Sequence, residues 1–136
     1  MDRLSPERRG WLMSRVKSKN TTTEMAVRRL VFGMDYRYRL HDKRLPGRPD
    51  LVFSGRRKII FVNGCFWHGH ESCRYAALPK TRVDFWRAKV EKNQARDREN
   101  IALLEANGWK VLTVWQCELK NTERLANRLY DFIEHE

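Results

Sequence analysis

The sequence lacks any apolar stretch long enough to cross a membrane. A spanning helix needs roughly 18 or more predominantly apolar residues, and no run in this chain of 136 residues reaches that length. The opening residues 1–6 lead into charge instead of the apolar run of a secretory signal. We therefore expect a cytoplasmic protein with no membrane partner.

Cysteine is also scarce. The chain has three cysteines, and an odd number cannot close completely into disulfides, which are in any case rare in the cytoplasm. Repeats, low-complexity runs and long linkers are missing as well, so the length fits one domain of about 100–150 residues. We expect a basic N-terminal arm over residues 1–20, with a short helix starting near Ser5-Pro6, and a single domain over residues 21–136.

Acidic residues are outnumbered by basic ones, 17 against 28, which gives a formal net charge of +11. An excess of this size on a small domain, with a pI near 10.1, is typical of proteins that bind nucleic acid. A basic protein without a polyanionic ligand is the plainer alternative. An anionic membrane surface is a further one, although no basic amphipathic anchor supports it.

The apolar pattern predicts a layered α/β domain with a mixed sheet. Two capping boxes, Thr21-x-x-Glu24 and Thr81-x-x-Asp84, predict helices that end near Gly33 and Gly108. Strands are expected over residues 36–40, 50–53, 58–62 and 109–115, and a last helix over residues 122–135. The third of these strands contains a continuous apolar run, Ile59 to Val62, which is typical of a central strand buried on both faces.

Residues 64–80 form a loop rich in cysteine and histidine. Three good zinc ligands follow one another at short spacing as Cys65-x4-His70-x2-Cys73, and Cys117 comes after a predicted strand. Thiolates and imidazole suit tetrahedral Zn²⁺, and four protein ligands make a closed structural site. Three ordinary reduced thiols with a surface histidine are the alternative. His68 is a competing ligand, which we assign to catalysis.

Asp50 begins a predicted strand directly after Gly47-Arg48-Pro49. Hydrolysis of a phosphodiester needs a divalent cation and an activated water, and Mg²⁺ often takes one or two carboxylates from the protein. Asp50 alone could be an ordinary turn residue, but its hairpin leads straight into the Cys/His loop, which favours a metal role. The capping box accounts for Glu24, and we expect residues 41–42 to be solvated.

Two large aromatic residues, Phe66 and Trp67, lie inside the polar loop. Rigid rings can wedge into a base step, which costs less at a mispair. Equally, both rings could cap the loop as a small apolar cluster. Trp86, on the apolar stripe of its helix, reads more readily as core than as a DNA contact, and Met13 on the arm is ambiguous.

Several motifs, in this order along the chain, resemble the very short patch repair endonucleases. They are Leu45-Pro46-Gly47-Arg48-Pro49-Asp50, the segment from Phe61 to His70, Phe85-Trp86 with Lys89, Asn93, Arg96 and Asp97, the segment from Gly108 to Val111, and Trp115-x-Cys117. The resemblance covers nearly the whole chain. It implies a restriction-endonuclease-like fold of three layers, a structural zinc, and Mg²⁺-dependent nicking 5′ to the thymine of a T·G mismatch, the product of 5-methylcytosine deamination.

The resemblance also implies roles for single residues. Asp50 and the carbonyl of Val62 would hold Mg²⁺, while His68 would help to activate water and Glu24 would orient or support it. Zinc would be held by Cys65, His70, Cys73 and Cys117. The implied DNA contacts are Met13, Phe66 and Trp67 beside the mispair, Lys89 and Asn93 near the bases or backbone, and Trp86.

Two positions depart from the wider nuclease pattern. An acid and a lysine are expected on the second strand where Val62 and Asn63 stand. Asn63 cannot act as an acid or base near neutral pH, but it could bind a water or a phosphate in the catalytic site. The Cys/His loop is one residue longer between His70 and Cys73 than in the resembling family. Both departures leave the catalytic rate open.

Two further functions remain open from the sequence. A zinc-stapled module could bind DNA without cutting it, and a restriction-type nuclease or an RNA nuclease could use the same fold on an unmismatched substrate. We expect a monomer that acts on mismatched double-stranded DNA, with mismatch-repair proteins as candidate partners.

Overall fold

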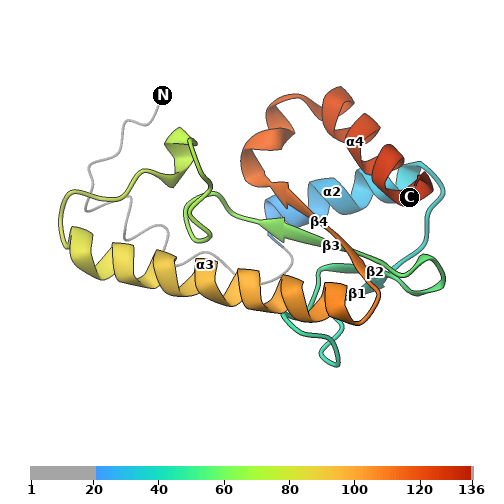
Figure 1. Ribbon diagram of the computed structural model, residues 1–136. Helices are drawn as coiled ribbons and strands as arrows, with labels where there is room; N and C mark the ends of the chain where they lie inside the picture. The colour runs from blue at the N-terminus through green and yellow to red at the C-terminus, as the bar shows by residue number, and fades with distance from the viewer. Residues whose placement is uncertain (1–20, 136) are drawn as a thin grey trace.

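The computed structural model describes residues 21–135. The predicted arm, its short helix and Met13 lie outside the described residues. The elements in chain order are α2 (Thr22–Gly33), β1 (Arg39–Leu40), β2 (Leu51–Phe53), β3 (Lys58–Asn63), α3 (Val83–Ala106), β4 (Lys110–Trp115) and α4 (Thr122–Glu134), with short 3-10 turns at Ser54–Arg56, Arg74–Ala76 and Gln116–Lys120 (Figure 1). The predicted α/β order of elements is confirmed.

The four strands form one mixed sheet in the order β1-β2-β3-β4. The first three strands are antiparallel, whereas β3 and β4 are parallel and are joined by the long crossover through α3. The apolar strand β3 is therefore central, as predicted. The antiparallel register places the start of β2 beside the carboxyl end of β3, which brings Asp50 next to the beginning of the Cys/His loop.

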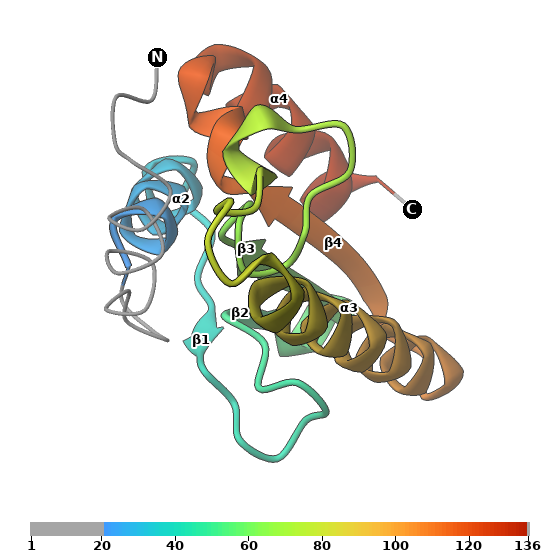
Figure 2. The ribbon, with the colours of Figure 1, turned by 90° about the vertical axis from the view of Figure 1, so that its left-hand side faces the viewer.

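Helices cover both faces of the sheet, because side chains of successive strand residues point to opposite faces. One core contains Leu51, Ile60 and Val114 from the sheet and packs against α2 and α4. The other contains Val52 and Ile59 and packs against Leu104 of α3. Figure 2 shows α2 and α4 on one side of the sheet and α3 on the other.

The two predicted capping boxes have different outcomes. Thr21 caps α2, since its hydroxyl accepts a hydrogen bond from the Glu24 amide at 3.1 Å. The cap predicted at Thr81 is wrong: α3 begins after Arg82, which has a left-handed backbone (φ 57°) and makes no side-chain cap hydrogen bond. A left-handed residue lacks the extended backbone that a side-chain cap requires. The predicted end of α3 is confirmed, with Gly108 at φ 87°.

A buried lysine anchors the last helix. Lys58 lies on β3, and its Nζ donates hydrogen bonds to the carbonyls of Phe132, Ile133 and His135 at 2.6, 2.9 and 2.7 Å. An ammonium group there satisfies carbonyls that the helix end leaves free and opposes their negative dipole. In the described part of the chain, no helix is long and apolar enough to span a membrane.

Candidate active site and metal centre

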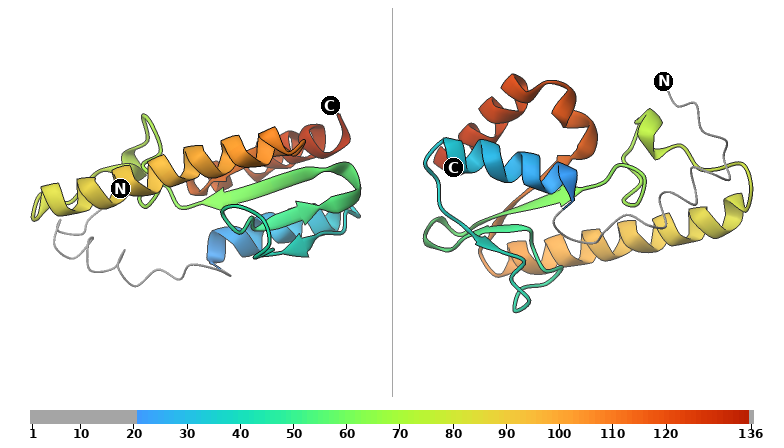
Figure 3. Two further views of the ribbon diagram at one scale, coloured as in Figure 1. Left: turned by 60° about the horizontal axis from the view of Figure 1, so that its bottom comes forward. Right: turned by 180° about the vertical axis from the view of Figure 1, so that it is seen from behind.

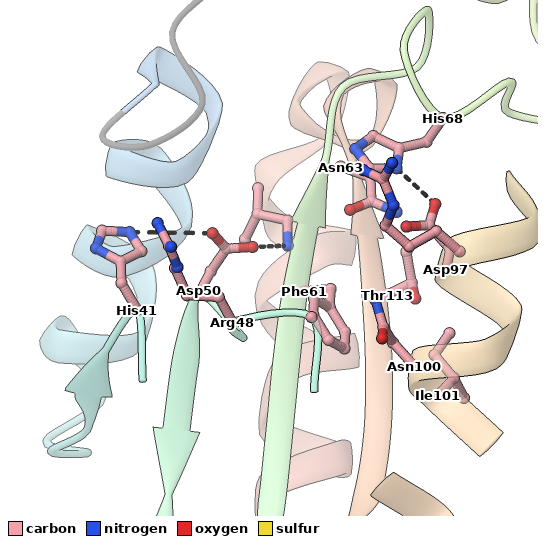
Figure 4. Close-up of a pocket in the computed structure, with 13 residues that line it drawn as sticks. His41, Arg48, Asp50, Phe61, Asn63, His68, Asp97, Asn100, Ile101 and Thr113 are labelled. Atoms are coloured by element: carbon pink, nitrogen blue, oxygen red, sulfur yellow. Dashed lines mark hydrogen bonds and ion pairs between the residues drawn. The ribbon is translucent and has the colours of Figure 1, made fainter. Parts of the chain in front are cut away.

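A cavity of about 400 Å³ opens between the carboxyl end of β3, the loop before β2 and the middle of α3. Figure 4 shows that Asp50 approaches it from one side of β3, whereas His68 and Asp97 approach it from the other. The residues that line the cavity are His41, Gly47, Arg48, Asp50, Phe61, Val62, Asn63, His68, Arg96, Asp97, Asn100, Ile101 and Thr113. Three predicted catalytic residues, Asp50, Asn63 and His68, therefore share one cavity.

Asp50 is held against the edge of the central strand. Its Oδ2 accepts a hydrogen bond from the Val62 amide at 2.7 Å. Burial raises the pKa of Asp50 to about 7, an effect that the Val62 amide opposes and the neighbouring Glu24 carboxylate reinforces. The N–H and C=O of one strand residue point to the same edge, so the Val62 carbonyl faces the side on which Asp50 lies.

Glu24 and His41 form a second part of this site. Glu24 is 2% exposed, and its Oε2 lies 2.8 Å from Nε2 of His41. The expectation that His41 is solvated is wrong, because its side chain is only 16% exposed and also lies 4.0 Å from Asp50 Oδ1. The capping box does not account for Glu24 either, since its carboxylate packs against this histidine. These contacts join residues that are far apart in the sequence.

The partner of His68 is Asp97 on α3. Nδ1 of His68 lies 2.5 Å from Oδ2 of Asp97, so the second ring nitrogen, Nε2, remains for a water or a phosphate. Asp97 was missed as a site residue. A signal was present, because Asn93, Asp97 and Asn100 recur at helical spacing and give α3 a polar stripe among its charged residues.

The Cys/His loop is tied to α3 near this pair (Figure 3). The side-chain amides of Asn93 and Gln94 donate to the carbonyls of Trp67 and Gly69, both at 2.9 Å. Gly69 has a φ of 58°, and a Cβ there would lie 2.6 Å from a methyl carbon of Val90. The loop approaches the helix so closely only because this residue has no side chain.

Charge and polarity in the cavity suit a phosphate. Arg48 from the loop before β2 and Arg96 from α3 both line it, and Asn63 lines it at the carboxyl end of β3. Guanidinium groups bind phosphate oxygens well, and an amide can donate to them. Asn63 is 8% exposed, and it lines the cavity as the last residue of β3.

The four predicted zinc ligands lie together. One ligand atom from each of Cys65, His70, Cys73 and Cys117 lies within 4.8 Å of the other three. His70 Nδ1 is 3.6 Å from the sulfur of Cys65 and 3.4 Å from that of Cys117. In a tetrahedral zinc site with usual bond lengths, sulfur and nitrogen ligands are about 3.6 Å apart. The donor set and spacing therefore fit a metal ion.

The environment of this cluster holds it in place. Burial raises the pKa of the Cys65 thiol to about 12, so without a metal this group stays protonated at neutral pH. The His70 ring stacks on Trp115 with centroids 4.1 Å apart. The amide of Cys117 donates to the Cys65 sulfur at 3.4 Å. Contacts of this kind, between the ligand residues and their neighbours, orient the ligands and support the binding of a cation.

The predicted DNA-contacting rings form an aromatic cluster. Phe66, Trp67 and Trp86 pack edge to face with centroids 5.3 to 5.7 Å apart. Phe66 is 2% exposed and Trp86 is 8% exposed, which agrees with the core interpretation of Trp86 and with the capping interpretation of Phe66. Lys89 is exposed on the same helix, where a polyanion can reach it.

Comparisons with known proteins agree with this arrangement. The family model described as DNA mismatch endonuclease Vsr matches residues 1–74. The type II nicking enzyme V.XorIIP of Xanthomonas oryzae pv. oryzae is 55% identical over 133 residues, which cover 98% of this chain and 97% of the relative. V.NmeAIP of Neisseria meningitidis, another type II nicking enzyme, is 43% identical over 94% of this chain and 91% of its own length.

The DNA mismatch endonuclease Vsr of Escherichia coli is 41% identical over 115 residues, which cover 85% of this chain and 73% of that protein. The match to the Xanthomonas relative, at 98% of this chain, takes in nearly all of the residues that build the cavity and the Cys/His cluster. The chain therefore belongs to the Vsr family of DNA mismatch endonucleases, and it is an endonuclease that acts on DNA.

Proposed function

We propose that this protein nicks one strand of duplex DNA 5′ to the thymine of a T·G mismatch, in a reaction that depends on Mg²⁺. The observation that carries the proposal is the shared cavity, which holds the half-buried carboxylate of Asp50 on one side and the His68–Asp97 pair on the other (Figure 4). The names of the relatives support cleavage of one strand and action on mismatched DNA. We also assign the mixed sheet and its two helical layers to the restriction-endonuclease-like fold.

Magnesium would be held by Asp50 and the Val62 carbonyl. Oδ2 of Asp50 accepts a hydrogen bond from the Val62 amide, and Oδ1 is the oxygen that would bind the ion. Mg²⁺ takes few ligands from a protein and keeps several waters. The ion would neutralise charge on the scissile phosphate and on the leaving oxygen. Arg48 and Arg96, which both line the cavity, would bind the remaining phosphate oxygens.

His68 would accept a proton from the attacking water at Nε2. Asp97 fixes the ring by its contact with Nδ1, and a carboxylate in that place stabilises the imidazolium that proton transfer creates. Asn63, which also lines the cavity, would orient the water or the phosphate. Glu24 acts from the other side of the site through His41 and Asp50.

Zinc would occupy the cluster of Cys65, His70, Cys73 and Cys117 and keep the Cys/His loop rigid. All four positions are filled by protein, so this ion would be structural. The loop carries His68, which lines the cavity, and the rings of Phe66 and Trp67, which pack with Trp86. Wedging at the mispair would then involve Trp67, with Phe66 leaving its buried position and Met13 contributing from the arm. Lys89 and Asn93 would contact the nearby DNA, and Trp86 would support the rings.

A single cleavage assay tests the proposal against its alternatives. Duplexes with a T·G or a T·A pair, labelled on each strand, and a structured RNA are incubated with the protein and Mg²⁺. We expect one nick, on the thymine strand of the T·G duplex. Binding to DNA without cleavage would identify a binding module. Equal cleavage of the matched duplex, or cleavage of the RNA, would identify one of the other nucleases.

Replacing Asp97 with Asn is expected to lower kcat by roughly ten- to a hundredfold, part of the roughly 10²- to 10⁴-fold that a general base contributes. KM should change little, because Asp97 positions His68 and binds no substrate. Steady-state nicking at varied duplex concentration measures both constants, and single-turnover nicking measures the chemical step separately. Asp84→Asn makes the same change of charge on an exposed part of α3 and should leave kcat unaltered. A normal rate in the Asp97 variant would contradict the role of the pair.

Replacing Asp50 with Asn should change how the stability of the metal-free protein depends on pH. Burial raises the pKa of Asp50 from its usual value to about 7, so between about pH 4 and 7 the folded protein keeps a proton that the unfolded chain releases. This contribution is complete below about pH 4 and is lost as pH rises through 7. The variant should therefore gain stability over the wild type as pH rises, in urea unfolding at pH 5 and pH 8. A difference independent of pH would rule this out.

A further inference from the structure

We propose that Glu24, His41 and Asp50 form a metal site that contains one nitrogen ligand and binds Mn²⁺-class ions more tightly than Mg²⁺. The proposal deepens the proposed function, because it shares Asp50 with the magnesium site. It assigns to His41, a residue with no role in the sequence-based expectations, the part of a direct ligand. His41 and Asp50 both face the cavity.

The three ligand atoms have the spacing of a coordination sphere. Adjacent ligands around a cation with bonds of about 2.1 Å are about 3.0 Å apart, and opposite ligands are about 4.2 Å apart. Nε2 of His41 lies 2.8 Å from Glu24 Oε2 and 4.0 Å from Asp50 Oδ1. One such atom from each residue lies within 4.8 Å of the other two. Both distances match those of an octahedral site.

Neighbouring hydrogen bonds hold the side chains of Glu24, His41 and Asp50 in place. Asp50 uses its other oxygen, Oδ2, to accept from the Val62 amide. The backbone amide of His41 donates to the Asp50 carbonyl at 3.2 Å, which fixes the two residues side by side. Arg28 lies 3.4 Å from Glu24 Oε2, at the long end of the hydrogen-bond range, so the carboxylate is shared between this arginine and the histidine.

The donor set determines which ion is preferred. Mg²⁺ is a hard cation that binds oxygen and dehydrates reluctantly, whereas imidazole is a ligand of transition metals. Two carboxylates and one imidazole therefore favour a first-row transition ion. A phosphate bridging this site and the arginines would complete the sphere during catalysis.

Pulsed electron paramagnetic resonance of Mn²⁺ added to the full-length, zinc-loaded protein without DNA tests the proposal. We expect coupling of the bound Mn²⁺ to one imidazole ¹⁴N, and its replacement by ¹⁵N coupling in protein labelled with ¹⁵N-histidine. His41→Gln should abolish the coupling and weaken Mn²⁺ binding by at least roughly tenfold, the smallest loss expected even for a residue that only supports a metal ligand. Mg²⁺ binding should change by less than twofold.

His68→Gln, which alters the other histidine of the cavity, is the matched control and should retain the coupling. Absence of nitrogen coupling in the wild type overturns the proposal without any variant, and so does coupling that disappears with His68 instead of His41. Mg²⁺-dependent nicking is measured on the same samples. Nicking without nitrogen coupling rejects this site alone, whereas coupling without nicking retains the site and rejects the proposed reaction.

Discussion

Replacing Asp50 with Asn is expected to reduce Mg²⁺-dependent nicking of a T·G duplex by roughly a thousandfold or more. A metal ion contributes several kcal/mol to stabilising charge in the transition state, and each 1.4 kcal/mol corresponds to about a tenfold change in rate. Asparagine keeps the size of the side chain and an oxygen that can accept from the Val62 amide. It loses the negative charge that attracts the cation. Single-turnover nicking measures the loss.

A measurement of DNA binding separates the loss of cleavage from a loss of folding. The variant should bind the T·G duplex as tightly as the wild type in a gel shift without metal, since Asp50 repels rather than attracts a phosphate. Asp35→Asn makes the same change of charge at an exposed position after α2 and should cut normally. If the Asp50 variant retains more than a tenth of the rate, the carboxylate does not hold the catalytic ion.

Replacing Cys65 with Ser is expected to cause the largest loss of stability of any single change in the Cys/His loop. Structural zinc sites in small peptides contribute about 10–16 kcal/mol of apparent binding free energy at pH 7, and a hydroxyl is a poor zinc ligand. Cys65 is 0% exposed, so the change also leaves a buried polar group. We expect less than half an equivalent of bound zinc by metal analysis, a lower midpoint of thermal unfolding and no nicking.

Glu71→Gln is the matched control for this change. Glu71 stands between two of the proposed ligands, is exposed and lies outside the ligand cluster. It should retain one equivalent of zinc and unfold at the wild-type temperature. A chelator should lower the unfolding midpoint of the wild type and the control, but not that of the Cys65 variant. Full zinc content in the Cys65 variant would show that the thiol is not a ligand.

Local patterns predicted most of the fold. Two short apolar runs and the turn residues Ser54-Gly55 between them were enough to predict the β2–β3 hairpin, and the Asn107-Gly108 stop was enough for the end of α3. The start of α3 was mispredicted, because a left-handed Arg82 depends on how the loop meets the helix. Lys58 gave no local sign of its role either, since its three acceptors are carbonyls at the C-terminal end of α4 and at the residue after it, more than 70 residues later.

The sequence by itself determined which chemistry the chain carries: the carboxylate at position 50, the spacing of the Cys/His loop, and the excess of positive charge. These signals are local, because each depends on residue types at short separation. Only the tertiary structure decided the partners. His41 packs against Glu24, and Asp97 against His68, because the antiparallel β2–β3 pairing and the parallel crossover through α3 bring distant segments to one edge of the sheet. Contacts of that kind are set by the packing of layers, which no short window of sequence contains.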